Sequence, residues 1–187
     1  IQELARQEDK LATFMAKPFN DEGGSGFHIH FSTWDDSGQP LFDDPKAKDG
    51  VSKTGKSAIA GVLAHAPALA AISNPTINSY KRFAEGSFAP TAVIWGKDNR
   101  TCSFRVVGHG EGLRVENRLP GADVNPYLAI SAMIAAGLDG IDRKLTLPPA
   151  CEGNAYVSDA ERVPTNMYAA RDLFRDSPLA NEAFGEE

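Results

Sequence analysis

The sequence has few cysteines, no excess of basic residues and no long hydrophobic run. Its 187 residues include only Cys102 and Cys151, too few for a disulfide framework, so we expect a reducing, cytoplasmic location. The formal net charge of -6 argues against nucleic-acid binding, which needs basic side chains to neutralise phosphates. The longest mostly apolar run, residues 126–138, is too short to span a bilayer, so we expect no membrane partner.

The chain also lacks an initiating methionine and a signal-peptide pattern at its start, Ile1 to Leu4. We therefore expect it to begin inside a longer protein. With 42% hydrophobic residues, it is long enough for one globular domain or for part of a larger one.

Two segments alternate between apolar and polar residues, as strands with one buried face do. Residues 26–32 place Phe27, Ile29 and Phe31 opposite a polar row, which consists of His28, His30 and Ser32. Residues 114–118 place Arg114, Glu116 and Arg118 on one face, while Val115 and Leu119 face the core. Imidazoles and carboxylates bind divalent cations, and guanidinium groups match phosphate oxygens. Together the rows predict metal-assisted chemistry on phosphate.

The remaining pattern predicts an α+β fold with a mainly antiparallel sheet backed by helices. We expect strands at about 13–17, 91–95, 102–107 and 113–119, and a helix over 57–63 that Pro67 kinks or ends. Asn125 followed by Pro126 is a typical helix start, and the helix that follows is apolar nearly all round, which predicts a buried scaffold helix. We expect His65 to be structural.

A phosphate-binding loop is a competing interpretation, because residues 50–57 match the pattern G-x-x-x-x-G-K-[ST]. Such a loop follows a buried hydrophobic strand, yet residues 42–49 are charged and contain Pro45. We therefore expect a polar loop that leads into a helix. If the phosphate-loop interpretation were correct, Lys56→Ala would abolish nucleotide binding.

Four ordered motifs resemble those of the glutamine synthetase superfamily, over almost the whole chain. The family pattern N-G-S-G-x-H-x-H-x-S corresponds to residues 23–32, N-S-Y-K-R to 78–82, N-R-x-x-x-x-R to 99–105, and R-x-E-x-R to 114–118. The resemblance implies that residues 1–187 are part of a catalytic domain. The upstream part of this domain and an amino-terminal domain would then lie outside the sequence. It also implies an incomplete α+β fold and, in the full protein, a homo-oligomeric ring.

The resemblance further implies an ATP-dependent ligase that phosphorylates the γ-carboxylate of glutamate and lets an amine displace the phosphate. It implies two or more divalent ions, Mg or Mn, in a complete site, with His28 as a ligand of the ion beside ATP and Glu116 as a ligand of the ion nearer glutamate. The nucleotide would contact His30, Ser32, Arg105 and Arg114. Glutamate or its γ-phosphoryl group would contact Gly24, Arg82, Arg100 and Arg118, the last two being catalytic. We expect residues 1–187 alone to be inactive, because upstream metal ligands are missing.

One departure from the family bears on the substrate. Ammonia-using members carry a glutamate in the loop after the N-S-Y-K-R arginine, but this sequence has Phe88, which cannot accept a proton. Gly23 also replaces a family asparagine. Both favour an organic amine as the acceptor, as in γ-glutamylpolyamine synthetases. Ordinary ammonia-dependent glutamine synthesis, with Glu85 substituting in a shifted loop, and a catalytically silent structural homologue remain open as alternatives.

Overall fold

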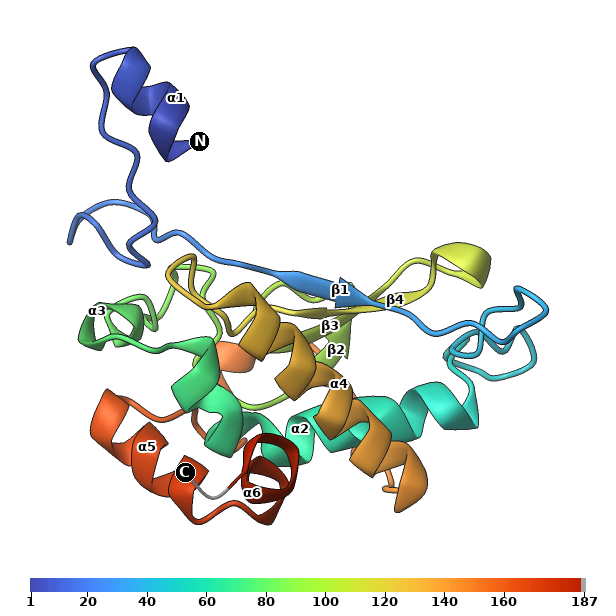
Figure 1. Ribbon diagram of the computed structural model, residues 1–187. Helices are drawn as coiled ribbons and strands as arrows, with labels where there is room; N and C mark the ends of the chain where they lie inside the picture. Colours follow the sequence, from blue (N-terminus) through green and yellow to red (C-terminus); the bar gives the residue numbers. More distant parts are fainter. Residues whose placement is uncertain (186–187) are drawn as a thin grey trace.

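The computed structural model describes residues 1–185 and has an α+β fold, with one small sheet and helices packed on one of its faces (Figure 1). The strands are β1 (Ile29–Phe31), β2 (Trp95–Lys97), β3 (Phe104–Val107) and β4 (Arg114–Asn117). The α-helices are α1 (Gln2–Gln7), α2 (Lys53–Ser73), α3 (Ile77–Tyr80), α4 (Pro126–Asp142), α5 (Met167–Arg175) and α6 (Pro178–Phe184). Two short 3-10 helices are η1 (Gly110–Gly112) and η2 (Ala155–Val157).

The sheet has the strand order β1-β4-β3-β2 and is mixed. The pairings β1–β4 and β3–β4 are antiparallel, as predicted, but β2 pairs with β3 in parallel. Two predicted strands are wrong: residues 13–17 form no strand, and the strand expected at 91–95 begins only at Trp95. The alternation predicted for β4 is confirmed, since Val115 and Leu119 lie in the core and Glu116 lies on the other face.

Helix α2 runs through Pro67 and continues to Ser73, so the proline does not end the helix, which was one of its two predicted effects. Ala66, Leu69 and Ala70 are buried around the proline, and this packing outweighs the missing backbone hydrogen bond. His65 is structural as predicted, because its Nε2 lies 2.7 Å from Asp139 Oδ2 of α4. By length and composition alone, α2 is apolar enough to cross a membrane, although 56% of its most apolar 18-residue stretch is buried inside the protein.

Helices α2 and α4 cross at a pair of glycines. A Cβ on Gly61 would lie 2.1 Å from Ala136 O, and a Cβ on Gly140 would lie 2.2 Å from Ser57 O. Only glycine allows the two backbones to approach this closely. The crossing lies beneath the sheet in Figure 1 and contributes to the main hydrophobic core.

Helix α4 begins as predicted, with the Asn125 side chain accepting hydrogen bonds from the N–H groups of Tyr127 and Leu128. The prediction that α4 is a buried scaffold helix is correct for only one of its faces. Its buried face consists of small residues and one methionine, namely Ala129, Ala132, Met133, Ala136, Gly137 and Gly140. The larger residues Ile130, Ile134 and Leu138 are exposed, the last by 53%. Small residues face α2 because the close helix crossing leaves no room for larger ones.

Candidate active site

A row of charged side chains crosses three strands on the face opposite the helices. The register pairs His30 of β1 with Glu116 of β4, and Glu116 in turn with Arg105 of β3. Glu116 lies at the centre of the row and is only 3% exposed. Its Oε2 accepts a hydrogen bond from Arg105 Nη1 at 3.1 Å, and its Oε1 accepts one from Arg118 Nη1 at 2.9 Å. The sheet thus brings together polar rows that the sequence separates by about 85 residues.

The Glu116 carboxylate stays ionised despite its burial. Burial alone would raise its pKa, but the hydrogen bond from Arg105 and the positive charge of Arg118 outweigh burial and lower the pKa below the ordinary value. A buried, ionised carboxylate among guanidinium groups is therefore available as an anionic ligand at neutral pH.

His28 lies immediately before β1 and contacts the same carboxylate. Its Nδ1 is 2.9 Å from Glu116 Oε1. Burial and the nearby Arg118 lower the pKa of His28, against the opposing effect of Glu116, so the neutral imidazole is favoured. A neutral imidazole beside a carboxylate has the chemistry of a divalent-cation site. Within residues 1–185 no group of three or more His, Cys, Asp and Glu side chains could hold a metal, so a cation bound by His28 and Glu116 would need further ligands.

Two of the predicted substrate arginines lie side by side and are buried. Arg82 and Arg118 are 4% and 5% exposed, and each has a buried Nε without a hydrogen-bond partner. Arg82 Nη2 donates to the carbonyls of Arg118 and Leu119. Burial, with a smaller effect from Arg118, lowers the pKa of Arg82 to about 10, so it remains charged at neutral pH. Two buried cations with unused donors suit an anionic ligand.

Gly24 lies against Arg82. A Cβ at this position would come within 2.8 Å of both Ala16 O and Arg82 Cγ. A side chain here would therefore displace either the backbone or the arginine. The neighbouring Gly26 approaches His28 in the same way, with a 3.0 Å distance from an added Cβ to His28 Nε2.

The residues predicted to contact the nucleotide extend from the carboxylate toward solvent. Arg114 Nε lies 3.3 Å from His30 Nδ1, and Arg114 Nη1 donates to Gly112 O at 2.8 Å. Ser32 is exposed and accepts a hydrogen bond from Trp34 Nε1. The structure therefore places His30 and Arg114 together, and Ser32 two residues further along the same strand direction.

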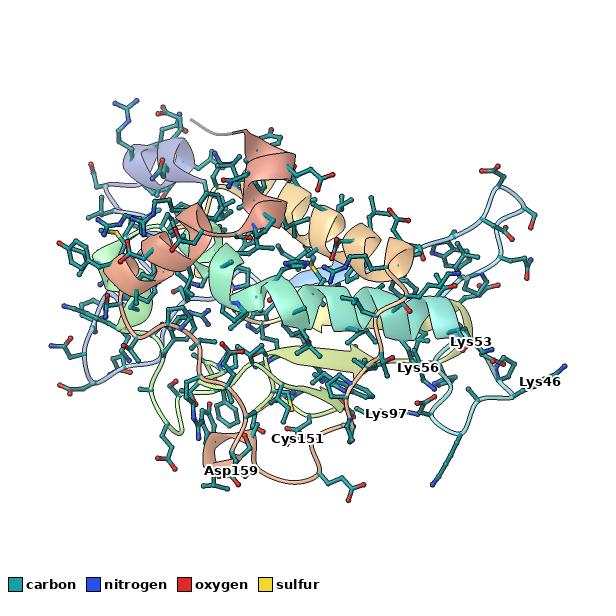
Figure 2. All side chains as sticks on the ribbon, turned by 90° about the horizontal axis from the view of Figure 1, so that it is seen from below. Lys46, Lys53, Lys56, Lys97, Cys151 and Asp159 are labelled. Atoms are coloured by element: carbon teal, nitrogen blue, oxygen red, sulfur yellow. The ribbon has the colours of Figure 1, made fainter. Side chains whose placement is uncertain are left out.

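Arg100 lies apart from the buried cluster. It is exposed, and within residues 1–185 no hydrogen bond or ion pair joins it to Arg82, Glu116 or Arg118. It lines a cavity of about 960 Å³ whose other lining residues include Lys97, Arg105 and Cys151. Figure 2 shows Lys97 and Cys151 on this side of the molecule. Arg105 reaches both the cavity and Glu116, so it links the two regions.

Sequence reasoning missed Asp98, which holds Arg105 from the other side. Arg105 donates to Asp98 Oδ1 through Nε at 3.0 Å and also through Nη2. Asp98 has φ +48°, a left-handed conformation that aspartate tolerates better than most residues. In the sequence, only its position just before Asn99-Arg100 could have indicated that Asp98 lies at this site.

The segment 76–82, which carries Arg82, is fixed by side chains that the motif specifies. Asn78 accepts a hydrogen bond from Lys17 N–H and donates one to Lys17 C=O, both at 2.8 Å. Ser79 Oγ donates to Asp123 Oδ2 at 2.7 Å, and so does Thr76 Oγ1. The N-S-Y-K-R pattern thus combines anchoring side chains with one buried arginine.

The chain resembles known proteins in both sequence and fold. The family model for the catalytic domain of glutamine synthetase matches residues 1–187. The chain is 50% identical over 185 residues to γ-glutamylethanolamide synthetase GlnA4 of Streptomyces coelicolor, covering 99% of this chain and 39% of the relative. It is 42% identical to the glutamine synthetase of Methanocaldococcus jannaschii and 42% identical to glutamate–isopropylamine ligase of a Pseudomonas species, covering all of this chain and 43% and 42% of those relatives.

The solved structure of a GmaS/ADP complex superposes with a TM-score of 0.90 at 34% identity, covering 97% of this chain and 44% of that one. The chain therefore spans about two fifths of the length of the relatives that it matches. The matching family model, the sequence identities and the structural superposition together show that this chain belongs to the glutamine synthetase family, within its catalytic domain.

Proposed function

We propose that the protein carrying this chain is an ATP-dependent ligase that joins an organic amine to the γ-carboxylate of glutamate through γ-glutamyl phosphate. The observation that carries the choice of amine is Phe88, an exposed phenyl ring where ammonia-using family members carry a glutamate. The similarity to amine-using relatives supports it, since γ-glutamylethanolamide synthetase is 50% identical.

Within this proposal the buried arginines bind and orient the anionic substrate. Arg82 and Arg118 have unused Nε donors that suit a carboxylate or a phosphoryl group, and Gly24 lets the backbone approach them. We assign Arg118 to charge stabilisation during phosphoryl transfer, because such transfer depends on positioned cations. We retain Arg100 as a catalytic and substrate-binding candidate from the cavity side, and His30, Ser32, Arg105 and Arg114 as nucleotide contacts.

A divalent ion, Mg²⁺ or Mn²⁺, would be held in part by His28 and Glu116. Their donor atoms are 2.9 Å apart, about the spacing of neighbouring ligands around an ion roughly 2.1 Å away. We therefore assign them to one shared ion rather than to two separate ions. When bound, the ion would neutralise phosphate charge. Glu116 meanwhile keeps Arg105 and Arg118 oriented through its two oxygens.

The full protein supplies the rest of the site in this proposal. We propose that residues 1–187 are part of one catalytic domain, that further metal ligands come from elsewhere in the protein, and that the enzyme is a cytoplasmic homo-oligomeric ring. Residues 1–187 alone should then be inactive.

Ammonia-dependent glutamine synthesis is the second candidate, favoured by the 42% identity to a named glutamine synthetase. Glu85 lies near Phe88 in sequence but is exposed and makes no hydrogen bond within residues 1–185, so nothing positions it as a base. A catalytically silent homologue is less well supported, because the Glu116 cluster and both buried arginines are intact.

The deciding experiment compares acceptors with the full-length enzyme. Phosphate release from ATP and glutamate is measured with ammonium, ethanolamine, isopropylamine, putrescine and other monoamines at equal concentrations of the unprotonated amine. We expect an organic amine to give the highest kcat/KM. Ammonium as the best acceptor would contradict the inference from Phe88 and support the second candidate, and no phosphate release with any acceptor would support the silent homologue.

A further inference from the structure

Residues 153–155, which lead into η2, are hydrogen-bonded to the connection between β2 and β3. Asn99 Nδ2 donates to Gly153 O at 2.7 Å, and Thr101 Oγ1 accepts from Ala155 N–H at 2.9 Å. Helix η2 then begins, with the Asn154 side chain accepting from the N–H of Tyr156. These contacts fix the backbone that carries Tyr156 relative to the sheet.

Tyr156 uses its hydroxyl to hold the loop that presents Phe88. Its Oη donates to Ala89 C=O at 3.0 Å. Burial raises the pKa of Tyr156, so the hydroxyl remains a donor throughout the physiological range. Tyr156 is half-buried and lies close enough to Arg82 and Arg118 for their charges to act on it.

The loop has a second attachment to the active site and a strained backbone. Arg118 Nη2 donates to Phe88 C=O at 3.1 Å, and Ser87 Oγ donates to the carbonyl of Arg82 at 3.1 Å. Phe88 itself has φ +59°, which a bulky residue adopts only when its surroundings hold it there. Two neighbouring carbonyls, those of Phe88 and Ala89, are thus held by Arg118 and Tyr156. Together they hold the phenyl ring in an exposed position.

We propose that Tyr156 is a positioning residue that fixes the Phe88 loop and thereby sets the selectivity of the enzyme for organic amines over ammonium. This inference rests on the proposed function. The Phe88 ring can distinguish organic amines from ammonium by contacting their alkyl groups, and this contact requires the ring to keep a fixed position. Without the hydroxyl, the strained loop can relax and the Phe88 ring no longer contacts the alkyl group of an organic amine. Ammonium has no alkyl group, so its binding should not change.

The test uses full-length Tyr156→Phe, which keeps the ring and removes only the hydroxyl. The matched control is Tyr168→Phe on α5, where the tyrosine is exposed and its ring lies near Arg171. We expect Tyr156→Phe to raise the KM for the organic amine about tenfold, the effect of losing one hydrogen bond. The KM values for ATP and glutamate should stay within twofold, and the preference for the organic amine over ammonium should fall by a similar factor.

A double-mutant cycle with Phe88→Ala separates positioning from a general structural effect. If Tyr156 acts through the loop, Tyr156→Phe should change the amine KM less than twofold in the Phe88→Ala background. Equal effects in both backgrounds, an unchanged amine KM, or parallel increases for all three substrates would overturn the inference. A wild-type enzyme that prefers ammonium would instead refute the proposed function, independently of these comparisons.

Discussion

At the scale of single residues, alternation along a strand was enough to predict which side chains share a face. His30, Glu116 and Arg105 meet because a period of two residues fixes the face of each side chain once the strands pair. Asp98 and Tyr156 could not be predicted in the same way. Their contacts with Arg105 and Ala89 depend on how a loop and a distant 3-10 helix fold back, which no local pattern specifies.

The phosphate-loop pattern shows how a motif can match without its structural context. Residues 42–49 contribute only one isolated bridge, from Asp43 to Val51, and no strand leads directly into α2. Lys56 lies on the first turn of α2 and its Nζ is 2.9 Å from Asp49 Oδ2. Figure 2 shows Lys56 near the beginning of that helix, beside Lys53. The lysine thus has a structural partner of its own.

Lys56→Ala should therefore leave ATP binding unchanged. We expect the affinity of the full-length enzyme for ATP to stay within twofold, and its stability to fall by no more than about 1 kcal/mol, because the ion pair with Asp49 is partly exposed. Isothermal titration with ATP measures the first quantity and thermal unfolding the second. Arg114→Ala is the positive control and should weaken ATP binding. Abolished binding in Lys56→Ala would restore the phosphate-loop interpretation.

At the scale of elements, hydrophobicity predicted the helices better than it predicted their packing. Helix α4 starts at the expected cap, yet its larger apolar residues are exposed and its small ones are buried. An apolar pattern on all sides cannot show which face a neighbour will cover. The glycines that decide it, Gly61 and Gly140, are 79 residues apart and become informative only when the two helices are known to cross.

Substitution at the crossing should separate two kinds of glycine on the same helix. Gly140→Ala forces backbone atoms of α2 and α4 apart, so we expect a destabilisation of about 1–3 kcal/mol. Gly137→Ala is the matched control, because its Cβ would meet only the Phe31 ring at 3.7 Å, and it should stabilise the helix by up to about 1 kcal/mol. Thermal unfolding of the full-length variants measures both. Equal shifts would mean that the crossing is not close-packed.

At the scale of the whole molecule, the formal net charge is -6, yet several arginines lie together at the candidate active site. Arg105 and Arg118 contact the buried Glu116 carboxylate, and the buried Arg82 lies beside Arg118, so three guanidinium groups gather at the site of an acidic chain. An acidic surface limits nonspecific attraction of anions, and the local cluster attracts those that enter the site. Composition could exclude classes of ligand but could not locate this cluster.

Divalent cations should stabilise the full-length protein through His28 and Glu116. At a Mn²⁺ concentration a hundred times its Kd, we expect the free energy of unfolding to rise by about 2.7 kcal/mol, and a chelator should reverse the effect. Differential scanning fluorimetry across a Mn²⁺ titration measures it. Glu116→Gln should lose most of the shift, whereas the exposed Glu182→Gln should keep it. A full shift in Glu116→Gln would remove this carboxylate from the metal site.

The paired hydrogen bonds between Asn78 and Lys17 have a consequence for comparing related sequences. They tether the arm that leads into Gly24 to the same short segment that carries Arg82. A relative that retained Arg82 but replaced Asn78 would keep the guanidinium group, but residues 17–24 would no longer be fixed next to it. Retention of both residues is therefore a stricter criterion for the proposed glutamate pocket than retention of the arginine alone.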